Sequence, residues 1–219
     1  MRGAPSLHRQ SGVSLPLLLI GTSILLVVFA TIYETWRLAR LAERGKALST
    51  AVQPFHNALV LYGLTHRTKL VASPTGAIAG VAVPLRPTCT ELKALMPSLL
   101  DYACTLPERA GTPLFEITPV PAGCAAVDCD LSFRIRTSGG VGNDADASEI
   151  VQRAVNHFGA EAGQSLVNDG GTIRGTGWTM TNPSGQVRTF GTYATYGAST
   201  LSTIPTLFAT RDPNFMGNV

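Results

Sequence analysis

Residues 13–33 read VSLPLLLIGTSILLVVFATIY, and this uncharged stretch decides how the rest of the chain is organised. Together with the residues just before it, it forms a run of 24 residues, Gln10 to Tyr33, without a charged side chain. As an α-helix rising 1.5 Å per residue, such a run would span ~36 Å, more than the ~30 Å of a bilayer's hydrocarbon core. The sequence therefore predicts a segment that can cross a membrane.

A helical pattern continues beyond this stretch without an intervening turn residue. Apolar side chains recur at alternating intervals of three and four residues, and Gly45 fills the one position that lacks an apolar side chain. The apolar positions are Leu38, Leu41, Leu48, Val52, Phe55, Leu59 and Tyr62. This spacing places one apolar face along a helix and predicts a packing seam. Pro54 is expected to kink that helix or to end its first section, because proline removes a backbone hydrogen bond.

The continuation separates two interpretations of the apolar stretch. A cleaved secretory signal is conceivable, with Val28-Phe29-Ala30 as the cleavage site. A secreted protein would have no reason to begin with an amphipathic extension of the same helix. The pattern therefore favours one helix of roughly 50 residues, apolar on all sides in its first half and amphipathic in its second.

Charge and composition narrow the class of protein further. The 219 residues carry a formal charge of +3, but residues 1–70 alone have eight Lys or Arg against two acidic residues, which leaves −3 for the rest. Because the positive charge surrounds the apolar stretch, the basicity does not predict nucleic-acid binding. Hydrophobic residues make up 45% of the chain, which excludes a disordered tail, and a single long apolar run excludes a polytopic membrane protein.

The remainder predicts an α+β head with an antiparallel sheet. Residues 131–137 alternate apolar and polar side chains, as a half-buried strand does. A second short strand is expected at residues 77–83, after a loop. Residues 90–102 have helical spacing that Pro97 interrupts, and residues 107–123, with four prolines, are expected to be irregular.

A helix and a hairpin are predicted in the last part of the head. Asp146 is a good N-cap for a helix whose apolar face runs to Leu166 and which Asn168-Asp169-Gly170-Gly171 would end. The hairpin would pair residues 172–181 with residues 186–195 across Asn182-Pro183-Ser184-Gly185. Trp178 is expected to pack on the sheet, because aromatic side chains mostly contribute buried area.

Four cysteines follow the helix, at Cys89, Cys104, Cys124 and Cys129. An even number predicts two disulfides in an oxidising compartment, with three possible connectivities. The local connectivity, Cys89 with Cys104 and Cys124 with Cys129, costs the least loop entropy. The sequence has no Cys-x-x-Cys pair and no histidine near the cysteines, so zinc binding is not expected. It also contains no complete nucleophile elbow, phosphate loop or dinucleotide loop. The sequence therefore predicts no enzyme, no metal and no cofactor.

The layout of the N-terminal region resembles that of type IV pilins. A short basic tail leads to Arg9-Gln10-Ser11-Gly12 and then Val13-Ser14-Leu15, which is similar to a prepilin leader. In that family a prepilin peptidase in the membrane cleaves after the glycine, and the new N-terminal residue is methylated. The resemblance implies cleavage between Gly12 and Val13. The family usually has Glu as the fifth residue of the mature chain, where this sequence has Leu17. This departure either counts against a prepilin or marks a subunit that starts or tips the filament, which resembles some minor pilins and pseudopilins.

The head narrows this resemblance. A strand, the Ser138-Gly139-Gly140 loop, a long helix and a Gly-rich approach to Trp178 follow in the order found in the constant N-terminal region of PilV-type minor pilins. In those proteins this region supports a C-terminal adhesin at the tip of a thin conjugative pilus. The sequence stops at Val219, before such an adhesin, so the resemblance concerns assembly more than receptor recognition.

These inferences divide the chain into a prepilin leader (1–12), a membrane-spanning and packing helix (13–64) and an exported α+β head with disulfides (65–219). The resemblance implies a minor type IV pilin, a structural or tip-associated subunit of a bacterial pilus involved in attachment or conjugation. Its implied partners are other pilin subunits, the prepilin peptidase and a ligand on a recipient cell, with no nucleic acid. Its implied location is the inner membrane, crossed once with a cytoplasmic N-terminus, and then the extracellular pilus. Two alternatives are a periplasmic binding or enzymatic domain on an uncleaved signal anchor, and a pseudopilin of a secretion system.

Overall fold

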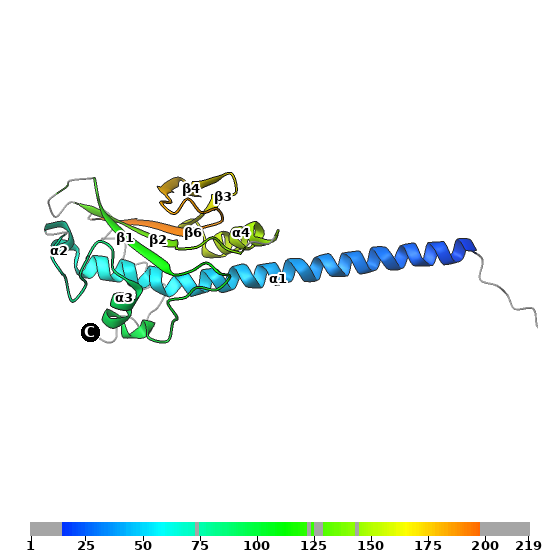
Figure 1. The fold of residues 1–219 in the computed structure, drawn as a ribbon, viewed down its shortest axis with the longest axis horizontal. Helices are drawn as coiled ribbons and strands as arrows, with labels where there is room; N and C mark the ends of the chain where they lie inside the picture. The colour runs from blue at the N-terminus through cyan, green and yellow to red at the C-terminus, as the bar shows by residue number, and fades with distance from the viewer. Residues whose placement is uncertain (1–14, 73–74, 122–123, 125–128, 143–144, 198–219) are drawn as a thin grey trace, which may run out of the picture. The chain divides into compact units, whose positions relative to one another are not determined.

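The computed structural model describes residues 15–72, 75–121, 124, 129–142 and 145–197 (Figure 1). Its elements in chain order are α1 (Leu15–Thr65), α2 (Arg67–Ala72), α3 (Cys89–Leu95), the 3₁₀ turn η1 (Pro97–Leu99), β1 (Pro113–Val120), β2 (Asp130–Thr137), α4 (Ala147–Phe158), β3 (Ala162–Leu166), β4 (Asp169–Gly175), β5 (Trp178–Thr181) and β6 (Phe190–Tyr196). The chain forms two units, Met1–Arg40 and Leu41–Val219, and α1 contributes to both. The second unit, called the head below, therefore includes the C-terminal half of α1.

The head is an α+β structure built on one antiparallel sheet, as the sequence predicts. The six strands lie in the order β1-β2-β6-β3-β4-β5, and every neighbouring pair is antiparallel. The last strand, β6, lies between β2 and β3 and so joins the two halves of the sheet. Helix α4 and the second half of α1 cover the sheet (Figure 1).

Strand β2 confirms the alternation predicted for residues 131–137. Leu131, Phe133 and Ile135 are all buried, on the face turned toward α1, while Arg134 and Arg136 lie on the opposite face. Phe133 lies so close to Gly63 of α1 that a Cβ added at Gly63 would collide with the phenyl ring. The sheet and α1 therefore meet through the side chains that the alternation predicts to be buried.

The prediction that residues 107–123 are irregular is wrong, because they contain β1. This strand pairs in register with β2 from Pro113 opposite Thr137 to Val120 opposite Asp130. Proline is tolerated here because β1 is an edge strand, where one row of backbone groups needs no partner strand. Phe115 and Ile117 alternate toward the core and provide the burial that fixes the strand.

The helix predicted to reach Leu166 ends at Phe158. Gly159 follows with φ of 105°, a conformation that glycine adopts readily and that stops the helix. The next residues form β3, in which Ala162 and Ser165 are buried and Leu166 is 41% exposed. Asn168-Asp169-Gly170-Gly171 therefore ends no helix, and its last three residues begin β4.

The predicted hairpin between residues 172–181 and 186–195 is also wrong. Strand β5 pairs with β4 across the turn at Thr176-Gly177, where Gly177 has φ of 78°. Strand β6 pairs with β2 and β3 instead. A local turn between β4 and β5 leaves β6 free to complete the centre of the sheet, where its apolar side chains are buried.

The segment before β1 matches the predictions in part. Residues 90–102 form α3 and η1 with Pro97 at the break, as predicted. The strand predicted at residues 77–83 is absent from the described structure, which has there a tight turn closed by one bridge between Ile78 and Val81. Both side chains are buried. Their apolar character therefore reflects packing in the core and does not indicate a strand.

Helix α1 continues through Pro54, so the proline does not end a first section. Val52 and Phe55, on either side of it, are fully buried in the head. Burial of two large apolar side chains offsets the loss of one backbone hydrogen bond.

Candidate functional site

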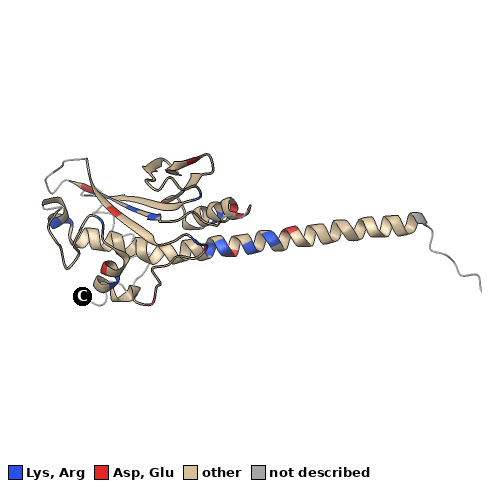
Figure 2. Ribbon diagram, viewed as in Figure 1, with Lys and Arg blue, Asp and Glu red and all other residues tan. Residues whose placement is uncertain are grey.

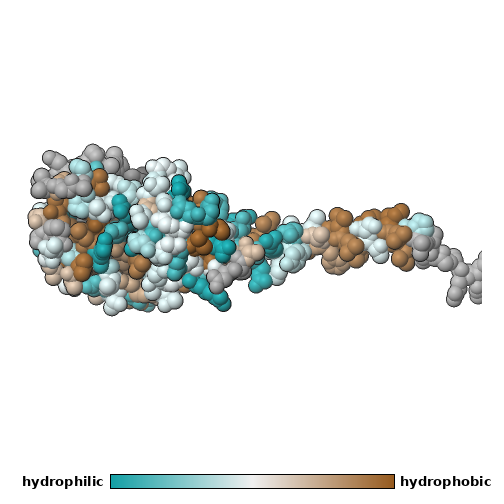
Figure 3. Space-filling view, turned by 45° about the horizontal axis from the view of Figure 1, so that its top comes forward, coloured by the Kyte–Doolittle hydropathy of each residue, from teal (hydrophilic) through white to brown (hydrophobic). Residues whose placement is uncertain are grey.

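The N-terminal half of α1 is apolar on every side and exposed. Leu17, Leu25 and Phe29 have 66, 56 and 60% of their surface accessible, and the other large side chains of residues 17–33 are similar. In Figure 3 this half carries a group of apolar residues. Residues 16–33 are an uncharged run of 18 helical residues, within the ~17–25 residues that a transmembrane helix needs. The described residues thus contain one helix long and apolar enough to cross a membrane.

The hydroxyl groups within this apolar segment have partners inside the helix. Thr22 and Ser23 donate to the carbonyl of Leu19 at 3.0 and 2.6 Å, and Thr31 donates to the carbonyl of Val28 at 2.8 Å. A hydroxyl that hydrogen-bonds to its own helix costs little when water is removed. The polar side chains of the segment are therefore compatible with a lipid or protein interior.

Aromatic and basic residues follow the apolar segment. Tyr33 and Trp36 are exposed, and the guanidinium of Arg40 lies 4.6 Å from the centre of the Trp36 ring. Arg37 pairs with Glu34 at 3.4 Å. Figure 2 shows basic residues gathered on α1 directly after its uncharged part. This is the order of side chains that a membrane–water boundary favours.

The predicted packing seam is buried in the head of the same chain. Six of its seven apolar positions are at most 3% exposed, namely Leu41, Leu48, Val52, Phe55, Leu59 and Tyr62. Leu38 is different, because it belongs to the first unit and is 42% exposed. Residues of this seam contact the sheet directly, as the rings of Phe55 and Phe115 show with centres 6.1 Å apart. The seam therefore stabilises the head on α1.

Gly45 marks the place where α4 crosses α1. A Cβ at this position would lie 2.5 Å from the Cβ of Arg153 and 2.9 Å from the backbone oxygen of Ile150. Only a residue without a side chain allows this approach. The one position of the seam without an apolar side chain is thus explained by a neighbouring helix.

Two histidines link α1 to the rest of the head. His56 is 3% exposed, and its Nδ1 lies 2.9 Å from the hydroxyl of Thr192 in β6. Its Nε2 lies 3.1 Å from a carboxylate oxygen of Glu161, just before β3. On α4, Nδ1 of His157 lies 2.7 Å from the hydroxyl of Ser49. These contacts give the buried polar groups partners and fix the rotation of α1 about its axis.

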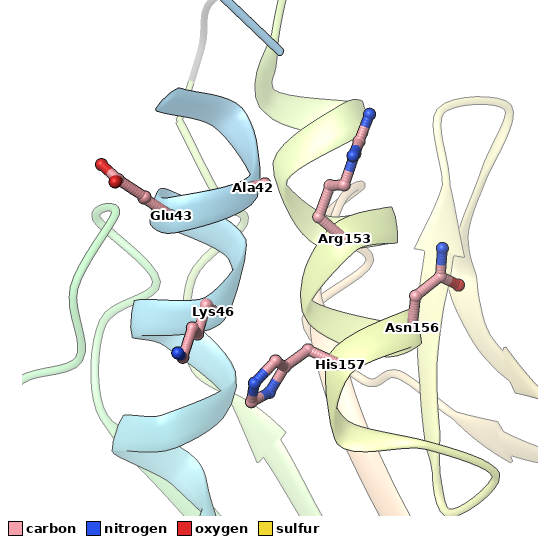
Figure 4. A pocket seen from close by; sticks show the side chains of 6 residues that line it. All are labelled: Ala42, Glu43, Lys46, Arg153, Asn156 and His157. Atoms are coloured by element: carbon pink, nitrogen blue, oxygen red, sulfur yellow. The ribbon is translucent and has the colours of Figure 1, made fainter. Parts of the chain in front are cut away.

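An open hollow of about 400 Å³ lies between α1 and α4 (Figure 4). It is lined by Ala42, Glu43, Lys46, Arg153, Asn156 and His157. Arg153 is paired with Glu149 at 2.8 Å and His157 with Ser49, so two of its polar side chains already have partners. Among the described residues no group of three or more metal-binding side chains comes together.

Both disulfides lie in the head. Cys89, at the start of α3, is bonded to Cys104, with Cα atoms 6.0 Å apart, and Cys124 is bonded to Cys129 with Cα atoms 5.8 Å apart. The first closes a loop of 15 residues around α3 and η1. This is the local connectivity, which requires the least loop closure.

The predicted processing site, Gly12 and Val13, lies outside the described residues. Leu17, at the position where the pilin family usually has Glu, lies in the first turns of α1 and is 66% exposed. No protein-family model, curated protein or solved structure matches the chain. The described residues thus contain one potential membrane-spanning helix, and the second half of that helix forms part of the core of a disulfide-bonded α+β head.

Proposed function

We propose that this chain is a minor type IV pilin, processed between Gly12 and Val13 and incorporated into a bacterial pilus as a structural or tip subunit. The observation that carries this proposal is the division of α1 into two unlike halves. The first half exposes apolar side chains on all sides, and the second half is buried in the head. No linker residue separates the two.

The apolar half needs a nonpolar environment, which a pilin would find in two places. Before assembly it would lie in the inner membrane, and afterwards among the equivalent helices of a filament. A helix that is apolar all round fits either environment. A simple membrane anchor explains the apolar half as well, so the processing of the N-terminus is what separates the two functions.

The lack of a carboxylate at Leu17 supports a place at the end of a filament. A carboxylate there would need a cation from a neighbouring subunit, because an unpaired charge in an apolar environment is costly. Leucine is uncharged and needs no cation from a neighbouring subunit. A subunit that starts or tips the filament would lack that neighbour.

The disulfides support export of the head. Disulfides persist in oxidising compartments such as the periplasm and the cell surface. If the head is exported, the single span places the N-terminus in the cytoplasm, where Arg2 and Arg9 fit the positive-inside tendency.

Mass spectrometry of the protein from pilus-bearing cells tests the proposal. We expect a mature N-terminus at Val13, a methylated α-amino group and loss of processing in Gly12→Leu. Gly3→Leu is the matched control, since it makes the same change in the basic tail and should be processed normally. Intact Met1 in assembled material would reject the pilin function and favour a signal-anchored periplasmic domain.

A further inference from the structure

The sheet face turned away from α1 carries a cluster of arginine and aromatic side chains. Arg134 and Arg136 of β2, Glu116 of β1 and Tyr193 of β6 lie on this face, because each alternates with residues that are buried toward α1. Arg86 reaches it from the loop before β1, and Trp178 stacks on Tyr193 with ring centres 5.4 Å apart. We call these six residues the arginine face.

The strand register brings the cluster together. Arg134 lies directly opposite Glu116 on one side and Tyr193 on the other. Its guanidinium carbon lies 5.7 Å from the centre of the Tyr193 ring. Arg136, two residues further along β2, points to the same side, so the two guanidinium groups stand side by side along one strand.

The carboxylate of Glu116 lies within 4 Å of three arginine side chains. Arg86 donates to Glu116 at 2.9 Å, which is a true hydrogen bond. The other two guanidinium groups stop at 3.9 Å (Arg134) and 3.8 Å (Arg136), beyond hydrogen-bond distance. Nε of Arg134 is buried and has no hydrogen-bond partner in the described structure. The side chains of Arg134 and Arg136 are only 31 and 23% exposed, so these donors are partly removed from water and poorly satisfied.

The face also has a local surplus of positive charge. Its three arginines and one glutamate leave it at +2, whereas residues 41–219 contain equal numbers of basic and acidic side chains. A surplus of this kind attracts an anionic partner. Carboxylates are matched to arginine by their planar, two-oxygen geometry.

The composition of the face favours a protein as the occupant. Arg, Tyr and Trp are the residues that dominate binding energy in protein interfaces, and Leu114, 39% exposed on the same side of β1, adds an apolar contact. The side chains stand on a sheet face, whereas sites for small molecules are concave. We infer that the arginine face binds an acidic segment of a partner protein, whose carboxylates pair with the partly exposed side chains of Arg134 and Arg136. This goes beyond the pilin proposal and does not depend on it.

A synthetic peptide of alternating glutamate and threonine is a suitable probe, since an extended chain would place its carboxylates on one side at the spacing of Arg134 and Arg136. Binding to the full chain in detergent micelles is measured through the fluorescence of Trp178, with Trp36→Phe removing the other tryptophan. We expect saturable, salt-sensitive binding that the double variant Arg134→Gln/Arg136→Gln weakens about tenfold or more. The double variant Arg153→Gln/Arg174→Gln makes the same charge change elsewhere and should bind within about twofold of the parent.

Glu116→Gln keeps the test decisive if the arginine variant does not fold. Without the Glu116 carboxylate, Arg86 loses its internal partner and no negative charge on the face repels the acidic peptide, so the peptide should bind several-fold more tightly. If the cluster were purely structural, the affinity for the peptide would not rise. Equal binding by the parent and a folded arginine variant would overturn the inference. It would also fail if inorganic phosphate bound as tightly as the peptide, because the face would then be a site for small anions.

Discussion

Tyr62 is a buried phenol without a hydrogen-bond partner in the described structure. It lies in the head half of α1, far beyond the apolar segment. Burial raises its pKa from 10.0 to about 12, and the negative charge of Glu91 adds to the shift. The folded chain therefore keeps the phenol proton at a pH where the unfolded chain has lost it. This contribution to stability is complete below pH 10 and is lost as the pH rises from 10 to 12.

Tyr62→Phe should remove that pH dependence. The free energy of unfolding of the parent should fall by about 1.3 kcal/mol between pH 9 and pH 11 relative to that of the variant. At pH 7 the variant should be as stable as the parent or more so, because an unpaired buried hydroxyl is lost. Urea denaturation at both pH values measures this. Tyr102→Phe, at a residue 41% exposed, is the control and should keep the fall; an identical alkaline fall in Tyr62→Phe would contradict the assignment.

Gly45 predicts a second effect at the level of one residue. Gly45→Ala inserts a methyl group between α1 and α4, where the backbone of Ile150 and Ala154 cannot retreat easily. We expect the head to lose about 1–3 kcal/mol of unfolding free energy, despite the better helix propensity of alanine. Gly21→Ala is the matched control in the same helix, because nothing lies within 4 Å of its added Cβ. Thermal unfolding in detergent should leave that control unchanged, and a stabilised Gly45→Ala would show that the helices can separate.

At the scale of elements, the two halves of α1 should respond differently to the same substitution. Leu48→Ala opens a cavity in the head core, where Leu48 is fully buried, and should cost about 2–5 kcal/mol. Leu25→Ala, at a side chain 56% exposed, should leave head unfolding unchanged. Chemical denaturation followed by the near-ultraviolet circular dichroism of the head compares the two. Equal losses would mean that the apolar half also belongs to the head core.

The elements also show what could be predicted from the sequence and why. The seam of α1 and the alternation of β2 are predictable because each repeats one periodicity over several residues. Strand β1 is not predictable in this way, because its prolines indicate irregular structure. They are tolerated only because β1 lies at the edge of the sheet. Helix α4 ends at Gly159. Ala162 and Leu166 belong to β3 but keep the helical spacing, so periodicity predicts the end of the helix too late.

The candidate site is divided in the same way. The spacing predicts that the seam is a packing surface, but it does not predict what packs against it. In the structure, the chain's own sheet packs against the seam. The arginine face is not visible as a motif. Glu116, Arg134 and Tyr193 come together only through strand pairing across nearly 80 residues of sequence. Alternating arginines at positions 134 and 136 were its one local signal.

At the scale of the whole molecule, the two units require different solvents. The first exposes apolar side chains that water does not favour, whereas the buried core of the described residues begins at Leu41. A chain of residues 37–219 keeps one helical turn ahead of Leu41 and removes the apolar segment. We expect it to be soluble without detergent and to unfold with the same free energy as the head of the full chain, within about 0.5 kcal/mol.

A second truncation makes this prediction strict. Residues 51–219 lack Leu41 and Leu48, both of them core side chains, as well as Gly45 at the crossing with α4. Loss of two buried leucines should lower the unfolding free energy by several kcal/mol, which is comparable to the whole stability of a small domain. Urea denaturation of both truncated chains and of the full chain in detergent decides the matter. If residues 37–219 aggregate or unfold while the full chain is stable, the apolar segment supports the head directly, and the two units are not independent.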